Sequence, residues 1–312
     1  MIAAALSAIL LAAPPEPRMN EPFTAALDRA LKGDKKVLQG LGIEEQIITS
    51  PLWDDRVSVD GAGVVTFTSR RPSGDAGGAA VGVFRSKMEK EELKSLLQAL
   101  RKLAAAPPPP ARSEAYETRI NLSAVADGHL FGVGAPVFPP ALEPLQPVLT
   151  PLNVAMGKAQ QNPVRSLALE LELPDGAGRS GLVAAVVHLK NAGSEGFWVS
   201  NPLTLPNQPE RDRVELVYAR PIVFTPGISP VPVPPSKTLL VPRDAATDVP
   251  RYLWIPPKGD VAVPLQAKFD GGDAKELVFR AELFAEEGPD EVAGQPRLRG
   301  SVFSADLTVQ LK

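Results

Sequence analysis

The chain has 312 residues, 44% of them hydrophobic, with 33 basic and 36 acidic side chains, two histidines and no cysteine. Because neither charge sign dominates, the composition argues against the basic field typical of nucleic-acid-binding proteins. The lack of cysteine excludes disulfides, a thiolate nucleophile and cysteine-ligated metal sites. The length and the apolar content predict two modest domains, each with its own core.

The N-terminal residues have the character of a targeting segment. Residues 2–13 are all apolar or small, a run too short to span a bilayer but long enough for the apolar part of a signal peptide. Prolines in residues 14–22 predict a tether. We therefore expect residues 1–22 to be a signal-like segment and tether, and the mature protein to be secreted or periplasmic without a membrane span. The alternative is a start at Met19 and a cytoplasmic protein.

Residues 23–162 predict an α+β domain in which an antiparallel sheet carries helices on one face. A helix is expected from Phe23 to a stop at Gly33, followed by a hairpin with its turn at residues 60–63. A third strand is expected near residues 81–83. Ser86, three residues before Glu89, predicts a capping box for a helix that carries a leucine stripe to residue 103.

The rest of this domain predicts two more strands and a helix. Apolar residues alternate with polar ones over residues 119–124, and a partner strand at 130–133 follows the turn at Asp127-Gly128. Thr150 before Pro151 predicts the N-cap and first position of a short helix that ends near Gln161.

Residues 163–312 predict an all-β sandwich. Strict alternation of apolar residues predicts strands over residues 167–173, 183–189, 214–218, 261–269, 277–283 and 303–311. Many alternating strands with turn residues between them favour two packed sheets.

Three segments carry a generic family resemblance: VVHLKNAGSEGFWVSNPL, LWIPPKGDVAVPLQAKF and ELVFRAELF. Together they resemble bacterial immunoglobulin-like modules, in which an Asn-x-Gly turn ends one strand and a Pro-Pro-x-Gly turn precedes a long strand. The resemblance implies an architecture only, because the Cys…Trp…Cys core of antibody domains is missing. The region also faintly resembles bacterial proteinase-inhibitor sandwiches, without a matching inhibitory loop.

Motifs for catalysis or cofactor binding are missing from the sequence. Leu182 stands where a GxSxG elbow needs its second glycine, and there is no P-loop. The aspartates near residues 54–60 and 270–273 lack the spacing of a calcium loop and predict turns. His188 is expected on the outer face of its strand, and His129 at a turn. We therefore predict no catalytic, cofactor-binding or metal-binding residue.

Two features suggest contact with a partner. Phe197 and Trp198 follow a glycine-bounded turn that favours an exposed ring. The second feature is a proline-rich stretch that includes Pro230, Pro232, Pro234 and Pro235. A preformed polyproline segment suits docking, although a surface connection explains it as well.

The sequence therefore favours a non-enzymatic exported or envelope-associated binding or scaffold protein, whose partner is a protein or an envelope polymer and not a nucleic acid. Two alternatives remain open. One is a carboxylate-dependent hydrolase with its site in an interdomain cleft, where ligand sites are common. The other is a proteinase inhibitor that acts through a sandwich loop.

Overall fold

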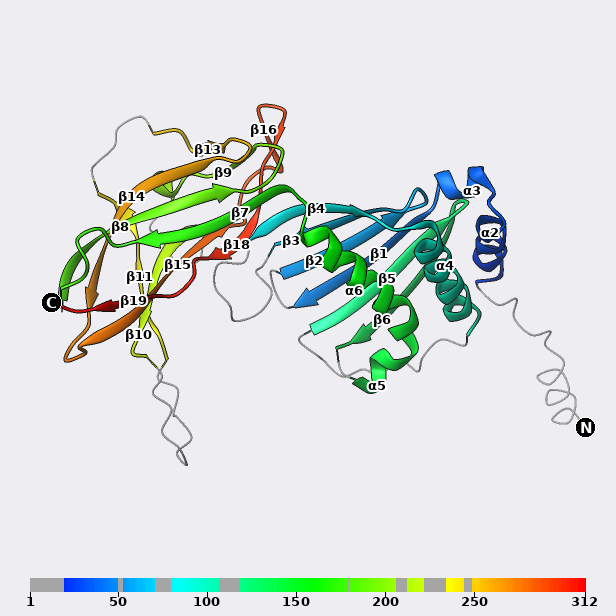
Figure 1. Cartoon of the computed structure of the whole chain (residues 1–312), viewed down its shortest axis with the longest axis horizontal. Helices are drawn as coiled ribbons and strands as arrows, with labels where there is room; N and C mark the ends of the chain where they lie inside the picture. Colours follow the sequence, from blue (N-terminus) through cyan, green and yellow to red (C-terminus); the bar gives the residue numbers. More distant parts are fainter. Residues whose placement is uncertain are drawn as a thin grey trace, which may run out of the picture. The chain divides into compact units, whose positions relative to one another are not determined.

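The computed structural model of the chain describes residues 20–49, 53–70, 80–106, 118–137, 139–178, 180–205, 212–221, 234–243 and 249–312 (Figure 1). The protein is mostly β, with large antiparallel sheets and few helices. Within the described residues, no helix has the length and apolar character needed to cross a membrane. Most of the signal-like segment, residues 1–19, lies outside the described residues.

The chain forms two compact units. The first unit contains residues 1–52, 56–66 and 86–159, and the second contains residues 53–55, 67–85 and 160–312. Residues 53–55 and 67–85 therefore group with the C-terminal part of the chain, whereas the sequence placed them in the N-terminal domain.

In the first unit, an antiparallel sheet carries helices on one face. Its strands run in the order β3-β2-β1-β5-β6. Leu103 and Leu149 from two helices pack on Ile120 of the sheet, and the Phe23 ring stacks on Phe131 at 5.4 Å. The elements are α2 (Glu21–Leu31), α3 (Lys35–Gln39), β1 (Gly42–Thr49), β2 (Trp53–Asp60), β3 (Val64–Ser69), α4 (Lys90–Ala105), β5 (Thr118–Ala126), β6 (His129–Pro136), α5 (Pro139–Leu142), the 3₁₀ helix η1 (Glu143–Leu145) and α6 (Gln146–Gln160).

The predicted hairpin turn is confirmed, and Asp60 explains it. Its Oδ1 accepts hydrogen bonds from the backbone N–H groups of Ala62 and Val64, both at 2.9 Å, which closes the turn between β2 and β3. Gly61 is required there, because a Cβ at this position would overlap the Leu38 carbonyl.

Two predicted helix starts are wrong. The residue at the N-cap of α4 is Glu89, which forms the capping box with Glu92, while Ser86 still lies in the preceding strand and donates to the Ala155 carbonyl. Helix α6 begins at Gln146 and contains Pro151 in its interior. The helix continues through the proline because its apolar face is buried, and tertiary burial outweighs a local start signal.

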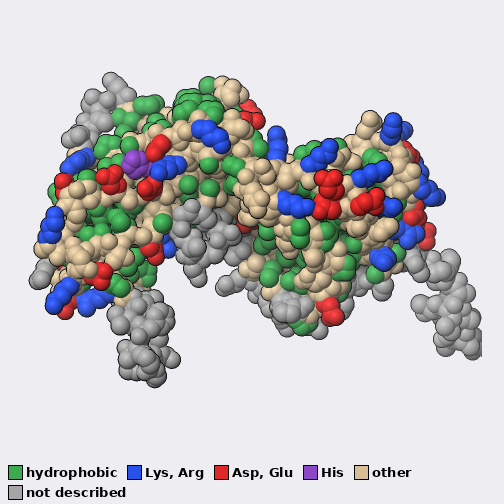
Figure 2. Space-filling model, viewed as in Figure 1, with side chains coloured by type: hydrophobic (Ala, Val, Ile, Leu, Met, Phe, Trp, Pro, Cys, Tyr) green, Lys and Arg blue, Asp and Glu red, His purple; other side chains and the backbone are tan. Residues whose placement is uncertain are grey.

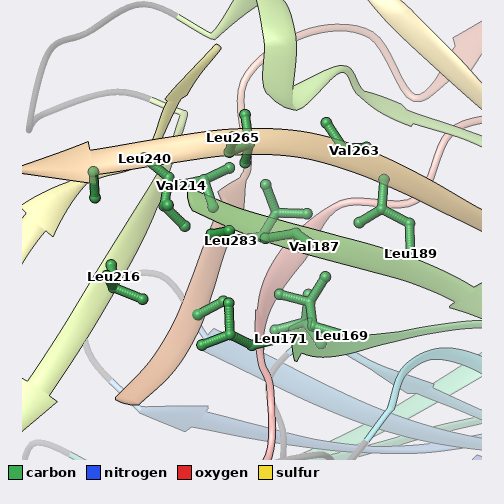
Figure 3. Packing of buried hydrophobic residues seen from close by; sticks show 14 of the residues in the cluster. Leu169, Leu171, Val187, Leu189, Val214, Leu216, Leu240, Val263, Leu265 and Leu283 are labelled. Atoms are coloured by element: carbon green, nitrogen blue, oxygen red, sulfur yellow. The ribbon is translucent and has the colours of Figure 1, made fainter. Parts of the chain in front are cut away.

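In the second unit, two antiparallel sheets pack around one core (Figure 3). Leu169, Val187 and Val263 come from the first sheet, and Leu216 and Leu283 come from the second. The first sheet contains β12 (Val241–Pro242), β14 (Asp260–Asp270), β8 (Ser180–Asn191), β7 (Pro163–Glu172) and β4 (Val81–Lys87) in that order, and the second contains β11 (Ser236–Leu239), β10 (Arg213–Ala219), β15 (Glu276–Ala285), β18 (Gly300–Phe303) and β19 (Leu307–Gln310).

The smaller elements of this unit lie beside these sheets. Strands β13 (Tyr252–Ile255) and β9 (Phe197–Ser200) pair with each other, as do β16 (Glu291–Val292) and β17 (Gln295–Pro296). The 3₁₀ helix η2 spans Pro202–Thr204.

The two glycine turns that the sequence singled out lie against each other. The Asn191 side chain accepts hydrogen bonds from the N–H groups of Ser166 and Gly193, and it donates to the carbonyls of Glu195 and Pro256. The Asn191 backbone N–H also donates to the Gly259 carbonyl at 2.9 Å. A single buried amide thus ties the end of β8 to the turn that precedes β14.

The single strand predicted over residues 303–311 is wrong. The chain forms β18 and β19, and both pair with β15. Between them, the buried Ser304 hydroxyl accepts a hydrogen bond from the Ala281 N–H at 2.9 Å. The break shifts the alternation, so that Val302, and not Phe303, is buried in the core.

Candidate functional site

A buried arginine lies at the centre of the candidate site in the second unit. The Arg297 side chain is fully inaccessible to solvent. Its Nη2 donates to the Ser200 hydroxyl at 2.8 Å and lies 3.5 Å from Asp212 Oδ2, and its Nη1 donates to the Pro289 carbonyl at 3.3 Å. The Tyr252 ring centre lies 5.5 Å from the guanidinium carbon. These contacts hold the guanidinium in one orientation.

Asp212 and Arg299 fix the segment that follows β15. Asp212 Oδ1 accepts hydrogen bonds from the N–H groups of Glu286 and Glu287, at 2.7 and 2.8 Å. Arg299 Nε donates to the Glu286 carbonyl at 2.7 Å, and its Nη1 donates to Asp290 Oδ1 at 2.9 Å. This part of the site is therefore built from charged groups that are already positioned.

A hollow of about 330 Å³ lies beside Arg297 and Arg299. Two further arginines, Arg70 and Arg165, contribute to its lining, and Asp290 and Glu291 are its acidic members. Four arginines and two acidic residues therefore line the hollow. Further carboxylates lie close to these arginines, since Asp212 pairs with Arg297 and Glu195 lies 3.7 Å from Arg165. The volume of the hollow lies at the lower end of the range for small-ligand pockets.

Two of these arginines keep unused hydrogen-bond donors. The Nε atoms of Arg165 and Arg297 are buried and have no hydrogen-bond partner among the described residues. The nearest carboxylate oxygen to Arg165 Nε belongs to Glu195 and lies 3.7 Å away, which is too far for a hydrogen bond. A buried donor without a partner costs free energy that an oxygen-bearing ligand can recover.

The acidic groups of the site differ in their protonation. The Arg299 guanidinium holds the pKa of Asp290 below its usual range, so Asp290 is ionised at neutral pH. Burial raises the pKa of Glu286, and the charges of Arg70 and Arg299 oppose this shift. Burial also lowers the pKa of Arg297, which Asp212 opposes. Arginine stays charged in proteins, so the four guanidinium groups keep their charge at every physiological pH.

Phe197 and Trp198 do not form the exposed pair that the sequence suggested. Phe197 is fully buried in the core, because its position in β9 points inward. Trp198 is half-buried and packs edge-on against Trp254, with ring centres 5.3 Å apart. The turn before them is packed as well, since a Cβ at Gly196 would overlap the Trp254 ring.

The proline-rich stretch is described only at its end. Pro234 and Pro235 are exposed and precede β11. Pro230 and Pro232 lie outside the described residues. Docking on the prolines therefore stays a prediction.

His188 lies on the outer face of the second unit, as its position in the strand predicted. Its ring nitrogens lie 3.0 Å from Asp260 Oδ1 and 3.5 Å from Glu172 Oε2. Figure 2 shows acidic and basic side chains gathered around a histidine on this face. Over the described residues, no group of three or more acidic or histidine side chains has the geometry to hold a metal ion.

Sequence reasoning missed all four arginines of the hollow. Arg70, Arg165, Arg297 and Arg299 come from three separate parts of the chain, and none lies in a recognisable motif. Arg297 and Arg299 are two residues apart, but this spacing is common in any chain. Only the folded chain brings them together.

Comparisons with known proteins give little further support. No protein-family model matches the sequence, and no curated protein matches it. One solved structure that is similar is described as "AvmM Catalyzes Macrocyclization in Alchivemycin A Biosynthesis". It is 14% identical, the match covers 46% of this chain and 88% of that chain, and the TM-score is 0.24.

Proposed function

We propose that this protein is a non-enzymatic, exported or envelope-associated binding protein whose second unit binds an anionic group in the hollow beside Arg297. The anionic group is a carboxylate or a phosphate on a partner protein or envelope polymer. The supporting observation is that four arginines line one hollow, and that the buried Nε atoms of Arg165 and Arg297 have no hydrogen-bond partner among the described residues. Guanidinium groups suit this ligand chemistry, because their planar N–H donors match carboxylate and phosphate oxygens.

The same residues favour binding over catalysis. Arginine does not exchange a proton at physiological pH, so it orients and neutralises an anion but does not act as a general acid or base. We further propose that the second unit is an immunoglobulin-like module that presents this hollow.

The test measures binding of two probes, inorganic phosphate and a hexaglutamate peptide, by isothermal titration calorimetry at low and high salt. We expect binding that weakens as salt increases, because the contact is ionic. Arg299→Gln should weaken binding about tenfold, the order expected for one charged hydrogen bond. Asp290→Asn should strengthen it, because Arg299 then loses a competing carboxylate.

Arg220→Gln is the matched control. Arg220 forms an exposed ion pair with Asp273 and does not line the hollow, so its loss should leave binding unchanged. Failure of both probes to bind, or equal weakening in the control and in Arg299→Gln, would refute the proposed site.

Export is tested separately. The untagged protein is located by cell fractionation, and its intact mass is measured. A chain shortened near residue 13 and found outside the cytoplasm supports export. A full-length chain, or one that starts at Met19, in the cytosol overturns it.

A further inference from the structure

Strand β6 is the last strand of the sheet in the first unit, and among the described residues no strand pairs with its outer edge. It pairs with β5, in a register that places Arg119 opposite Pro136. In the same register, the Val137 N–H donates to the Thr118 carbonyl at 3.0 Å. Because hydrogen-bonded and non-hydrogen-bonded positions alternate, the odd-numbered residues of β6 bond to β5.

The even-numbered residues of β6 therefore direct their backbone groups away from the sheet. Leu130, Gly132 and Gly134 each offer an N–H and a carbonyl, and Pro136 offers a carbonyl only. In the described part of the chain, no backbone hydrogen bond reaches these outward groups. They form an unused row of donors and acceptors.

This edge lacks the usual protection against strand pairing. Exposed edge strands commonly carry a lysine or another charge that blocks a second strand. The eight residues of β6 include no Lys, Arg, Asp or Glu. Instead, the Leu130 side chain is 78% exposed, and Gly132 and Gly134 are exposed without a side chain.

We propose that β6 pairs with β6 of a second copy of this chain, in an antiparallel register centred on Gly132. In this register, Gly132 faces its own counterpart, and Leu130 lies opposite Gly134 of the second copy. Each outward N–H of Leu130, Gly132 and Gly134 then finds a carbonyl. A register centred on Val133 would place Leu130 opposite Pro136, which has no N–H to donate.

The shape and charge of the edge favour a second copy over an unrelated strand. The exposed Leu130 side chain projects over a glycine, which leaves room for it on both sides of the two-fold axis. A two-fold axis brings a charged residue near the axis close to its own copy, and the two like charges repel each other. Strand β6 contains no Lys, Arg, Asp or Glu and avoids this repulsion. The edge is therefore complementary to itself.

The oligomeric state tests the proposal. Sedimentation equilibrium of the full chain should show a dimer of the 33.1 kDa protein that dissociates on dilution. Gly132→Lys should give monomers, because it places two lysines opposite each other at the axis. Leu130→Lys should also give monomers, because a lysine on an edge strand blocks pairing with a second strand. Both positions are exposed, and a Cβ at Gly132 comes no closer than 4.0 Å to the Leu122 carbonyl, so both variants should keep the wild-type circular dichroism spectrum.

Leu182→Lys is the matched control, since Leu182 is 72% exposed in β8 of the second unit. It should stay dimeric. A monomeric wild-type protein at all concentrations overturns the proposal, and so does a dimer that persists in Leu130→Lys and Gly132→Lys.

A crosslink tests the register. The natural chain has no cysteine, so Gly132→Cys introduces a single thiol. The two copies of residue 132 should lie about 5.5 Å apart between Cα atoms, as in a hydrogen-bonded antiparallel pair. A short bismaleimide should therefore link the Gly132→Cys dimer, but not a Leu182→Cys dimer. A Gly132→Cys dimer that does not crosslink excludes edge pairing.

Discussion

Each unit buries a charged residue, but only the charged residue in the second unit has hydrogen-bond partners among the described residues. In the second unit, Arg297 is enclosed by Asp212, Ser200 and backbone carbonyls. In the first unit, Glu45 on β1 is 1% exposed, and neither carboxylate oxygen has a hydrogen-bond partner in the described residues. The paired charge fixes loops around a hollow, whereas the unpaired charge makes its unit sensitive to pH.

The protonation state of Glu45 follows from its position in the sheet. It points to the helix-covered face, opposite Leu122 of β5 and between Ile43 and Ile47 of its own strand. Burial raises its pKa to about 7, because the charged form loses its hydration and gains nothing in return. Glu45 is therefore protonated in the folded protein below about pH 7.

Replacing Arg297 tests the buried ion pair with Asp212, and it has the largest expected effect on the free energy of unfolding. Arg297→Leu leaves the Asp212 carboxylate buried without its counter-charge, which should cost about 3–5 kcal/mol of unfolding free energy. Urea denaturation followed by tryptophan fluorescence measures it, because Trp198 and Trp254 lie in β9 and β13 of the second unit.

A double variant separates the loss of the pair from the burial of a lone charge. If the pair matters through charge compensation, adding Asp212→Asn to Arg297→Leu should recover part of the lost stability. A double variant less stable than Arg297→Leu would show that the aspartate matters mainly through its bonds to Glu286 and Glu287.

The unpaired Glu45 carboxyl should make the stability of the first unit depend on pH. Its pKa is higher in the folded state than the unfolded value of 4.5, so its favourable contribution is complete below pH 4.5 and is lost as pH rises to about 7. The first unit should lose about 3 kcal/mol across this window. Urea denaturation at several pH values, followed by far-UV circular dichroism of its helices, measures this loss.

Glu45→Leu should remove most of this pH dependence and raise stability at pH 8. Glu44→Gln is the control, because Glu44 is a half-buried neighbour that lies 3.7 Å from Arg56. It should keep the wild-type pH profile. The same slope in Glu45→Leu and wild type would mean that Glu45 does not titrate as its burial implies.

Asn191 provides a third case, because its buried side chain is polar but uncharged and makes hydrogen bonds through both its oxygen and its nitrogen. Asn191→Ala removes four side-chain hydrogen bonds and leaves the buried Ser166 N–H without an acceptor, so we expect a loss of about 2 kcal/mol. Tryptophan fluorescence during urea denaturation reports it. Asn191→Asp keeps the two accepted bonds and should cost less, unless the new charge is itself destabilising.

The smallest effect is expected for an exposed pair. Arg101 forms an ion pair with Asp28 in which both side chains are more than 40% exposed, and water screens such contacts. Arg101→Ala should therefore leave the denaturation midpoint unchanged within error. A marked shift would mean that solvent exposure does not separate weak charge pairs from strong ones in this protein.

The sequence by itself determined the local elements. Alternation of apolar residues predicted β5, β7, β8, β14 and β15, and Asp60 with its glycines predicted the turn between β2 and β3. These features depend on residues close together in the chain, where periodicity and turn chemistry are direct physical signals. The first residues of α4 and α6 were predicted wrongly, because packing outweighed the local signals at Ser86 and Thr150.

Only the tertiary structure decided which charged residues are buried and what they meet. Nothing in the local sequence distinguishes Glu45 from the half-buried Glu44, yet one residue's shift in a strand reverses the face of the sheet. Likewise, Arg70, Arg165, Arg297 and Arg299 meet at one hollow because distant segments pack together. Desolvation and pairing of charges depend on these long-range contacts, which a pattern of neighbours along the chain does not encode.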